Sequence, residues 1–217
     1  MLRNAGVRYL VAGGVAVNAH GYLRLTYDVD LVIQLAPDNI QLAFNALAAL
    51  GYRPTVPVTA EQFSDEAQRA RWIRENGMQV LNFHSDLHRP FTVDVFVSVP
   101  FDFEREYGAA LQGELAPGLI VRFVSIPELI EMRELANRPR DLDGIEHLRM
   151  ILEGQRRSER TVDAGWETAT WEGSRRFQLR SALALTVRER MQALESLVEL
   201  AQRLAKMPRS QGVSAEE

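Results

Sequence analysis

The amino-acid sequence predicts an α+β protein with a small mixed β-sheet flanked by helices and a helical extension at the C-terminus. Three patterns predict this fold class. Short apolar runs at residues 9–12 and 26–33 end at glycines or carry aspartates, as buried strands do. A second strand pattern, with alternating side chains, covers residues 91–99. After residue 125 the apolar residues take the spacing of amphipathic helices.

Length and composition set the outer bounds of the protein. The chain has 217 residues, 46% of them hydrophobic, which suffices for one ordinary domain and an appendage. We expect a first domain at 1–153, a polar linker at 154–165 and a helical C-terminal extension at 166–217. The net charge of −4 gives no general argument for nucleic-acid binding. The absence of cysteine excludes disulfides and thiolate chemistry and agrees with a cytoplasmic location.

The remaining elements follow from periodicity and from capping signals. No run reaches the roughly 18 apolar residues of a membrane span, and the N-terminus lacks the pattern of a signal peptide. Besides the strands at 9–12, 26–33 and 91–99, we expect strands at 78–84 and 120–124. We expect helices at 40–50, 59–74, 125–137, 141–152 and 186–206, and a short helix that begins near residue 15.

The stretch from Tyr9 to Ile33 contains most of the residues that could bind a ligand. The apolar strand stops at Gly13-Gly14, and a glycine pair lets the backbone turn tightly and approach a ligand. A helix that begins just after the pair directs its first free N–H groups at the turn, where they favour an anion such as phosphate.

Two aspartates follow in the next strand. Asp28 and Asp30 are two residues apart, so their side chains share one face of the strand. Two carboxylates on one face repel each other unless a cation lies between them. Mg²⁺ prefers hard oxygen ligands and commonly binds one or two carboxylates together with substrate phosphates. The glycine turn and the paired aspartates therefore predict a site for a Mg²⁺–nucleoside triphosphate complex.

Asp94 is the one charged residue of the strand at 91–99. A carboxylate inside an apolar strand is costly unless it is paired or bound to a metal. Asp94 is therefore a candidate metal ligand or an aspartate that bonds to a backbone turn, and the resemblance described next implies that it is the third carboxylate of the same site.

The whole stretch resembles the nucleotidyltransferase superfamily related to DNA polymerase beta. More narrowly, it is similar to the small bacterial nucleotidyltransferases associated with toxin–antitoxin operons. The matching features are the Gly13-Gly14 turn, Arg24 with Thr26, and the Asp28-x-Asp30 pair. The resemblance implies the nucleotidyltransferase fold, with a basic residue in the helix at 125–137. Relatives usually have lysine there, and Arg133 is the nearest match in this chain.

The resemblance also implies an activity. A nucleoside monophosphate would move from ATP or another nucleoside triphosphate to a hydroxyl acceptor, with release of pyrophosphate. Asp28, Asp30 and Asp94 would be catalytic and hold one or two Mg²⁺ ions. The nucleotide-binding residues would be Gly13, Gly14, Arg24 and Thr26.

Several alternatives stay open from the sequence. The acceptor could be a protein, tRNA or a small molecule. The chain could instead be a non-catalytic antitoxin or a protein-binding module on the same fold. The helix at 187–206 carries an apolar stripe that its own domain, a second copy of the chain or a partner protein could cover. His20 is equally well read as a phosphate neighbour or as a histidine that hydrogen-bonds locally. His84 and His88 lack the other ligands of a zinc site.

Overall fold

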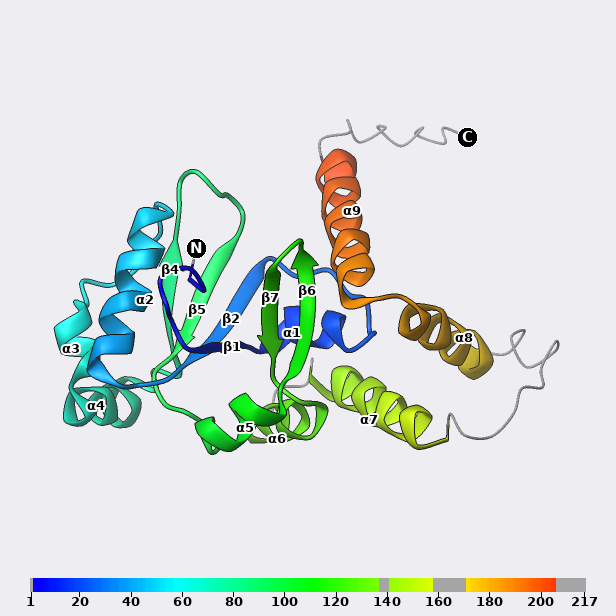
Figure 1. The fold of residues 1–217 in the computed structure, drawn as a ribbon, viewed down its shortest axis with the longest axis horizontal. Coiled ribbons are helices and arrows are strands. Elements are labelled where there is room, and N and C mark those ends of the chain that lie inside the picture. The colour runs from blue at the N-terminus through cyan, green and yellow to red at the C-terminus, as the bar shows by residue number, and fades with distance from the viewer. Residues whose placement is uncertain (1, 137–140, 158–170, 206–217) are drawn as a thin grey trace, which may run out of the picture.

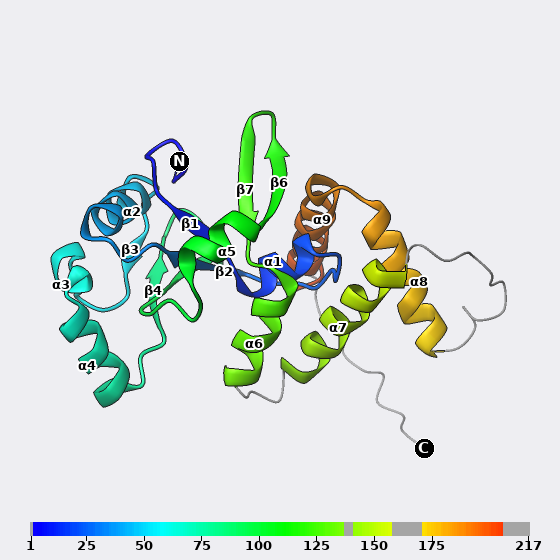
Figure 2. The ribbon, with the colours of Figure 1, turned by 60° about the horizontal axis from the view of Figure 1, so that its bottom comes forward.

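The computed structural model describes residues 2–136, 141–157 and 171–205. It forms a seven-stranded mixed sheet with helices around it (Figures 1 and 2). The strand order is β3-β4-β5-β2-β1-β7-β6. The strands are β1 (Tyr9–Val11), β2 (Asp28–Ile33), β3 (Arg53–Pro54), β4 (Val80–His84), β5 (Thr92–Phe96), β6 (Leu111–Ala116) and β7 (Leu119–Phe123).

Most of the helices form two groups toward the two ends of the sheet, with α1 and α5 between them, as both views show (Figures 1 and 2). Helices α2 to α4 lie beside β3 and β4, and α6 to α9 lie toward β6. The bounds are α1 (Gly13–Ala19), α2 (Pro37–Ala49), α3 (Ala60–Ser64), α4 (Glu66–Asn76), α5 (Phe103–Ala109), α6 (Ile126–Ala136), α7 (Asp141–Arg157), α8 (Trp171–Ala184) and α9 (Val187–Ala205).

The mixed α and β character is confirmed, and the sheet is larger than the sequence suggested. Strands β3 and β6 and helix α5 were not predicted. In β6 the buried position is Gly113, which offers no side chain to reveal a strand. A Cβ atom built there would lie 2.4 Å from Cγ1 of Val187, so the first residue of α9 fills the space. The apolar pattern of β6 is therefore completed by a residue from another element.

Two further differences concern helices. The helix expected at 59–74 is two helices, because Asp65 ends α3 and its carboxylate accepts hydrogen bonds from the Ala67 and Gln68 backbone N–H groups to begin α4. Helix α7 continues to Arg157, into the segment expected to be a linker. The rest of that linker, from 158 on, lies outside the described residues, as do the start of the C-terminal extension and the end of the helix at 186–206. The domain boundaries therefore stay predictions.

Helix α9 packs on its own chain. Leu194 and Val198 are buried, and the helix lies against α1 and β6. Arg190 is also buried, and its guanidinium donates to the carbonyl oxygens of Leu183 and Ala19. These bonds join α9 to the end of α8 and to α1, so one wall of the region around α1 comes from the C-terminal part of the chain.

Candidate functional site

The three predicted aspartates lie on one face of two adjacent strands. Strands β2 and β5 are parallel, and their register places Asp30 beside Asp94 and Asp28 beside Thr92. Because residues paired across a ladder share a face, all three carboxylates project from the same side of the sheet centre. The strands that carry them are separated by more than 50 residues of sequence, yet their parallel pairing places the three carboxylates on one face.

Neutral side chains donate to two of the aspartates. The Thr92 hydroxyl donates to Oδ1 of Asp28 at 2.8 Å, and the Asn82 side-chain amide donates to Oδ1 of Asp94 at 2.6 Å. Asn82 lies opposite Asp94 in the antiparallel pair of β4 and β5. Sequence reasoning missed both donors. Alternation within 80–84 puts Asn82 on one face of its strand, but the register that sets it against Asp94 is not visible in the sequence.

Asp30 is the most perturbed carboxylate of the trio. Its pKa is raised to about 6, chiefly by burial and also by the negative charges of Asp94 and Asp28. A hydrogen bond from the Gly14 backbone N–H and the charge of Arg133 act against this rise. Burial also raises the pKa of Asp94, while the hydrogen bond from Asn82 opposes the change. Burial is therefore the main factor that disfavours the ionised form of these two carboxylates.

The backbone of the diglycine turn packs directly against the Asp30 carboxylate. Gly13 has a φ of 58°, in the left-handed region, and a Cβ atom built on it would lie 1.7 Å from Oδ2 of Asp30. The sequence predicts a helix that begins near residue 15, whereas α1 begins at Gly13 itself. The first turn of α1 therefore meets the Asp30 carboxylate directly, which is possible because residue 13 has no side chain.

Arg24 and Thr26 lie over the second glycine. A Cβ atom on Gly14 would lie 2.8 Å from Oγ1 of Thr26 and 3.2 Å from Nη2 of Arg24. Nε of Arg24 is buried and has no hydrogen-bond partner within the described residues. A buried guanidinium N–H without a partner is uncommon, because an unsatisfied polar group costs roughly 1–3 kcal/mol. It fits an anion that binds beside the turn.

Asn18 holds the arginine loop in place, and sequence reasoning missed it as well. Its side chain is fully buried, and its carbonyl oxygen accepts from the Arg24 backbone N–H at 2.6 Å. Its amide group donates to the Arg24 and Gly14 carbonyl oxygens, each at 3.0 Å. A polar residue inside a short apolar helix was the available signal, because such a residue must find partners when it is buried.

Arg133 approaches the site from α6. It is buried, and its Nη1 donates to Oδ1 of Asp141 in α7 at 2.9 Å. Its charge helps to lower the pKa of Asp30. A Cβ atom on Gly144 would lie 2.9 Å from Nη1 of Arg133, so α7 packs closely over the arginine. The position that the resemblance assigns to a basic residue thus lies near the carboxylates.

The histidines lie apart from this arrangement. Nε2 of His20 is 2.8 Å from the carbonyl oxygen of Val124, and burial lowers the pKa of its imidazole. His20 therefore joins α1 to the chain after β7, which favours the hydrogen-bonding interpretation over the phosphate one. His88 stacks on Tyr52 with ring centroids 5.5 Å apart.

Within the described residues, no three or more histidine, aspartate or glutamate side chains are gathered as a group that could hold a metal.

The chemistry of the donors nevertheless fits a divalent cation. Asp30 and Asp94 are neighbours in register, are partly or largely buried, and both have raised pKa values. A Mg²⁺ ion needs one or two carboxylates when phosphate oxygens and water complete its octahedron. Two carboxylates in this state match that requirement, and a cation between them would relieve their repulsion.

A cavity of about 360 Å³ opens beside Asp28. One wall comes from β2, the chain just before it and Phe91, and the other comes from α9. Its lining is mainly apolar and includes three carboxylates but no lysine or arginine. The lining residues are Val15, Thr26, Tyr27, Asp28, Val29, Phe91, Leu194, Glu195, Val198, Glu199 and Gln202. Its volume lies within the range of about 300–1,000 Å³ that is usual for small-molecule sites.

Comparison with known proteins adds little to this geometry. No protein-family model matches the chain, and no curated protein matches it either. Among solved structures, the chain is similar to the solution structure of the antibiotic-resistance factor ANT(2'')-Ia. That similarity has a TM-score of 0.42 and 15% sequence identity and covers 94% of each chain. No helix in the described ranges combines the length and apolar character needed to cross a membrane.

Proposed function

We propose that this protein is a nucleotidyltransferase that moves a nucleoside monophosphate from a nucleoside triphosphate to a hydroxyl acceptor. The observation that supports it best is the placement of Asp28, Asp30 and Asp94 on one sheet face beside the diglycine turn. The partnerless Nε of Arg24 supports it further, because it leaves a positive group for the triphosphate close to carboxylates that suit a metal. A fold alone would not carry this proposal.

In the proposed reaction, the acceptor oxygen attacks the α-phosphorus of the nucleotide. A new P–O bond forms, the bond between the α-phosphorus and the bridging oxygen of the β-phosphate breaks, and pyrophosphate leaves. Asp94 takes the proton of the acceptor hydroxyl. Asp30 and Asp94, with Asp28, would hold Mg²⁺, which when bound supplies positive charge to the transferred group and the leaving oxygens.

The other residues position the substrate. The missing side chains of Gly13 and Gly14 let the triphosphate approach the backbone, with Arg24 beside it and Thr26 next to the turn. We assign the acceptor to the cavity between Asp28 and α9. The triphosphate would be repelled there, because the lining includes three carboxylates and no lysine or arginine.

Transfer of a radiolabelled nucleotide tests the proposal. The purified protein is incubated with α-labelled ATP, CTP, GTP or UTP, Mg²⁺, and cell protein, tRNA or small-molecule extract. We expect one fraction to gain label, and Asp30→Asn and Asp94→Asn to lose it by at least a thousandfold. Asp38→Asn, on helix α2, is the matched control and should retain activity.

The alternative function predicts a different result. A binding module or antitoxin would label no fraction and would act equally well with Asp30→Asn. That pair of results, obtained with folded protein, would contradict the proposed activity and support binding through an exposed surface such as Leu197 and Leu200 of α9.

A further inference from the structure

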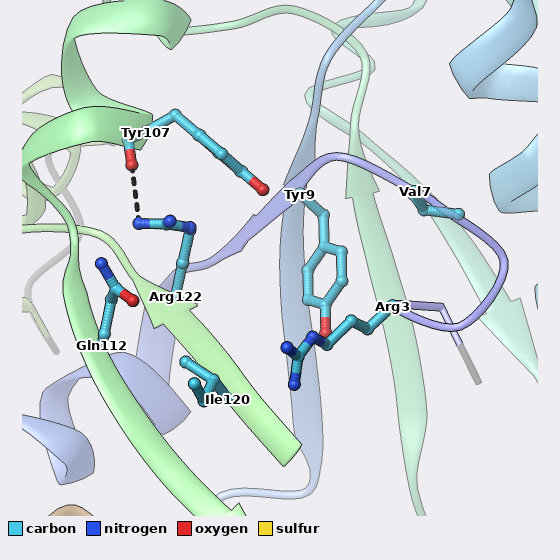
Figure 3. Close-up of a pocket in the computed structure, with 7 residues that line it drawn as sticks. All are labelled: Arg3, Val7, Tyr9, Tyr107, Gln112, Ile120 and Arg122. Atoms are coloured by element: carbon cyan, nitrogen blue, oxygen red, sulfur yellow. Dashed lines mark hydrogen bonds between the residues drawn. The ribbon is translucent and has the colours of Figure 1, made fainter. Parts of the chain in front are cut away.

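A second, smaller cavity lies away from the carboxylates. It has a volume of about 170 Å³ and is lined by residues of the N-terminal turn, β1, α5, β6 and β7 (Figure 3). Tyr9 is paired with Ile33 in the ladder of β1 and β2, so it projects from the opposite face to Asp28 and Asp30. No residue of the proposed active site lines it. The lining residues are Arg3, Val7, Tyr9, Tyr107, Gln112, Ile120 and Arg122.

Two arginines face this cavity without carboxylate partners. Nη1 of Arg122 donates to the Tyr107 carbonyl oxygen at 3.1 Å, and Nη1 of Arg3 donates to the Gly118 carbonyl oxygen. Within the described residues neither guanidinium forms an ion pair. In Figure 3, Arg3 lies beside the hydroxyl end of Tyr9, and Arg122 lies between Tyr107 and Gln112. Each arginine therefore keeps N–H groups to donate.

The carboxylates of Glu104 and Glu114, on the neighbouring elements, already accept hydrogen bonds from other groups. Both oxygens of Glu104 accept from Arg8, and one of them also accepts from Gln34. Oε1 of Glu114 accepts from the Gly118 backbone N–H. None of these acids lines the cavity, so the charge that faces it is positive even though the whole chain carries −4.

The Tyr107 ring holds the guanidinium of Arg122 at one side of the cavity. Cζ of Arg122 lies 4.5 Å from the centroid of the Tyr107 ring, and Cζ of Arg8 lies 4.7 Å from the same centroid. Stacking on an aromatic face holds a guanidinium while its edge stays free to donate. The Tyr9 hydroxyl and the Gln112 amide add neutral donors to the same space. Fixed guanidinium edges are the groups that match phosphate oxygens.

We propose that this cavity binds a phosphate group, either inorganic phosphate or the terminal phosphate of a small phosphomonoester. Its volume is below the roughly 300 Å³ of a site for a whole small molecule, which limits the buried part to a single anionic group. A dianion there would also neutralise positive charge that Arg3 and Arg122 bring to the cavity. The site is separate from the nucleotide site and would bind without Mg²⁺.

Binding of inorganic phosphate, measured by isothermal titration calorimetry in chloride buffer without Mg²⁺, tests this site. We expect saturable binding to the full-length protein and to Asp94→Asn, because Asp94 lies elsewhere. We expect at least a tenfold loss of affinity in Arg3→Gln and Arg122→Gln. Arg71→Gln, an exposed arginine on α4, is the matched control and should bind as the unmodified protein does. A parallel titration with ribose 5-phosphate identifies the source, because tighter binding of that compound assigns the site to phosphomonoesters.

Tyr9→Phe is a conservative variant that tests the site even if the arginine variants fail to fold. It keeps the ring and removes one donor, so it should weaken phosphate binding without changing the thermal unfolding temperature in chloride. Absence of saturable binding to the full-length protein would overturn the proposal. Equal affinity in Arg3→Gln, Arg122→Gln and the unmodified protein would overturn it as well.

Discussion

The glycine at position 13 is required for two separable reasons. Its φ of 58° costs a residue with a side chain about 1–2 kcal/mol, and a Cβ atom there would collide with the Asp30 carboxylate. Gly77 supplies a matched comparison, because it has a φ of 63° and open space where its Cβ atom would lie. Comparing substitutions at Gly13 and Gly77 therefore separates the effect of backbone strain from the effect of the steric clash with Asp30.

We therefore expect Gly13→Ala and Gly77→Ala to differ. Both should lose about 1 kcal/mol of unfolding free energy from strain. Gly13→Ala should lose more, because Asp30 must move, and its nucleotidyl transfer should fall at least a hundredfold. Urea unfolding and the labelled-nucleotide assay measure the two effects. Equal loss of stability and full activity in both variants would show that Asp30 does not rest against the turn.

Asp30 makes the folded state sensitive to pH. Its ordinary pKa is 3.8 and its pKa in the folded protein is about 6, so between these values the folded chain holds a proton that the unfolded chain has lost. Stability therefore falls as pH rises from about 4 to about 6 and stays lower above that. The difference corresponds to about 3 kcal/mol.

Asp30→Asn should remove most of this dependence. We expect the variant to be more stable than the unmodified protein at pH 7.5, by about 1–3 kcal/mol, while it loses nucleotidyl transfer. Thermal unfolding at pH 4.5, 6 and 7.5 measures the change, with the exposed Glu131→Gln on α6 as control. A variant that is less stable at pH 7.5 and keeps the same pH slope would contradict the burial of an ionised Asp30.

At the scale of elements, α9 forms a wall of the cavity beside Asp28. Val198 is 6% exposed and lines the cavity, whereas Leu200 is 52% exposed and does not. The two positions lie on one helix, so the same enlargement of each side chain tests the cavity against the general effect of altering α9.

Val198→Phe should fill part of the cavity. We expect kcat/KM for the acceptor to fall at least tenfold, while binding of the nucleotide with Mg²⁺ changes little. Leu200→Phe should behave as the unmodified protein. Steady-state kinetics and a nucleotide-binding titration measure these values. If both variants transfer nucleotide normally, the acceptor does not enter this cavity.

The sequence predicted the strands that carry the three aspartates better than it predicted strand β6 and the hydrogen-bond partners around the site. Alternation in residues 26–33 and 91–99 was enough to place Asp28, Asp30 and Asp94 on the faces of their strands, because the period of a strand is two. Asn82 and Asn18 escaped prediction, since their partners depend on strand register and on a loop that returns to α1. Strand β6 escaped it because Val187, more than 70 residues away, fills the space at Gly113.

At the scale of the whole molecule, ligand binding at the site should stabilise the folded state. A ligand that binds only the folded state stabilises it by about 2.7 kcal/mol when its free concentration is a hundredfold above Kd. For a chain of this size, each kcal/mol raises the midpoint of thermal unfolding by about 2–4 °C.

We therefore expect a nucleoside triphosphate with Mg²⁺ to raise Tm by about 5–10 °C. The nucleotide with a chelator should raise it much less, and Asp30→Asn should show a smaller rise because one of the carboxylates proposed to hold the cation becomes a neutral amide. Differential scanning calorimetry measures all three. An equal rise with and without the divalent cation would argue against a metal-assisted site.

The contribution of α9 to the cavity has a consequence for how such a protein can diversify. The groups assigned to bond making and bond breaking lie within the first hundred residues, whereas half of the wall that would meet the acceptor lies near the other end of the chain. Under the proposed function, substitutions in that distant helix would alter which molecule is modified while the acidic centre stays intact. Two homologous chains with the same carboxylates can therefore differ completely in what they modify.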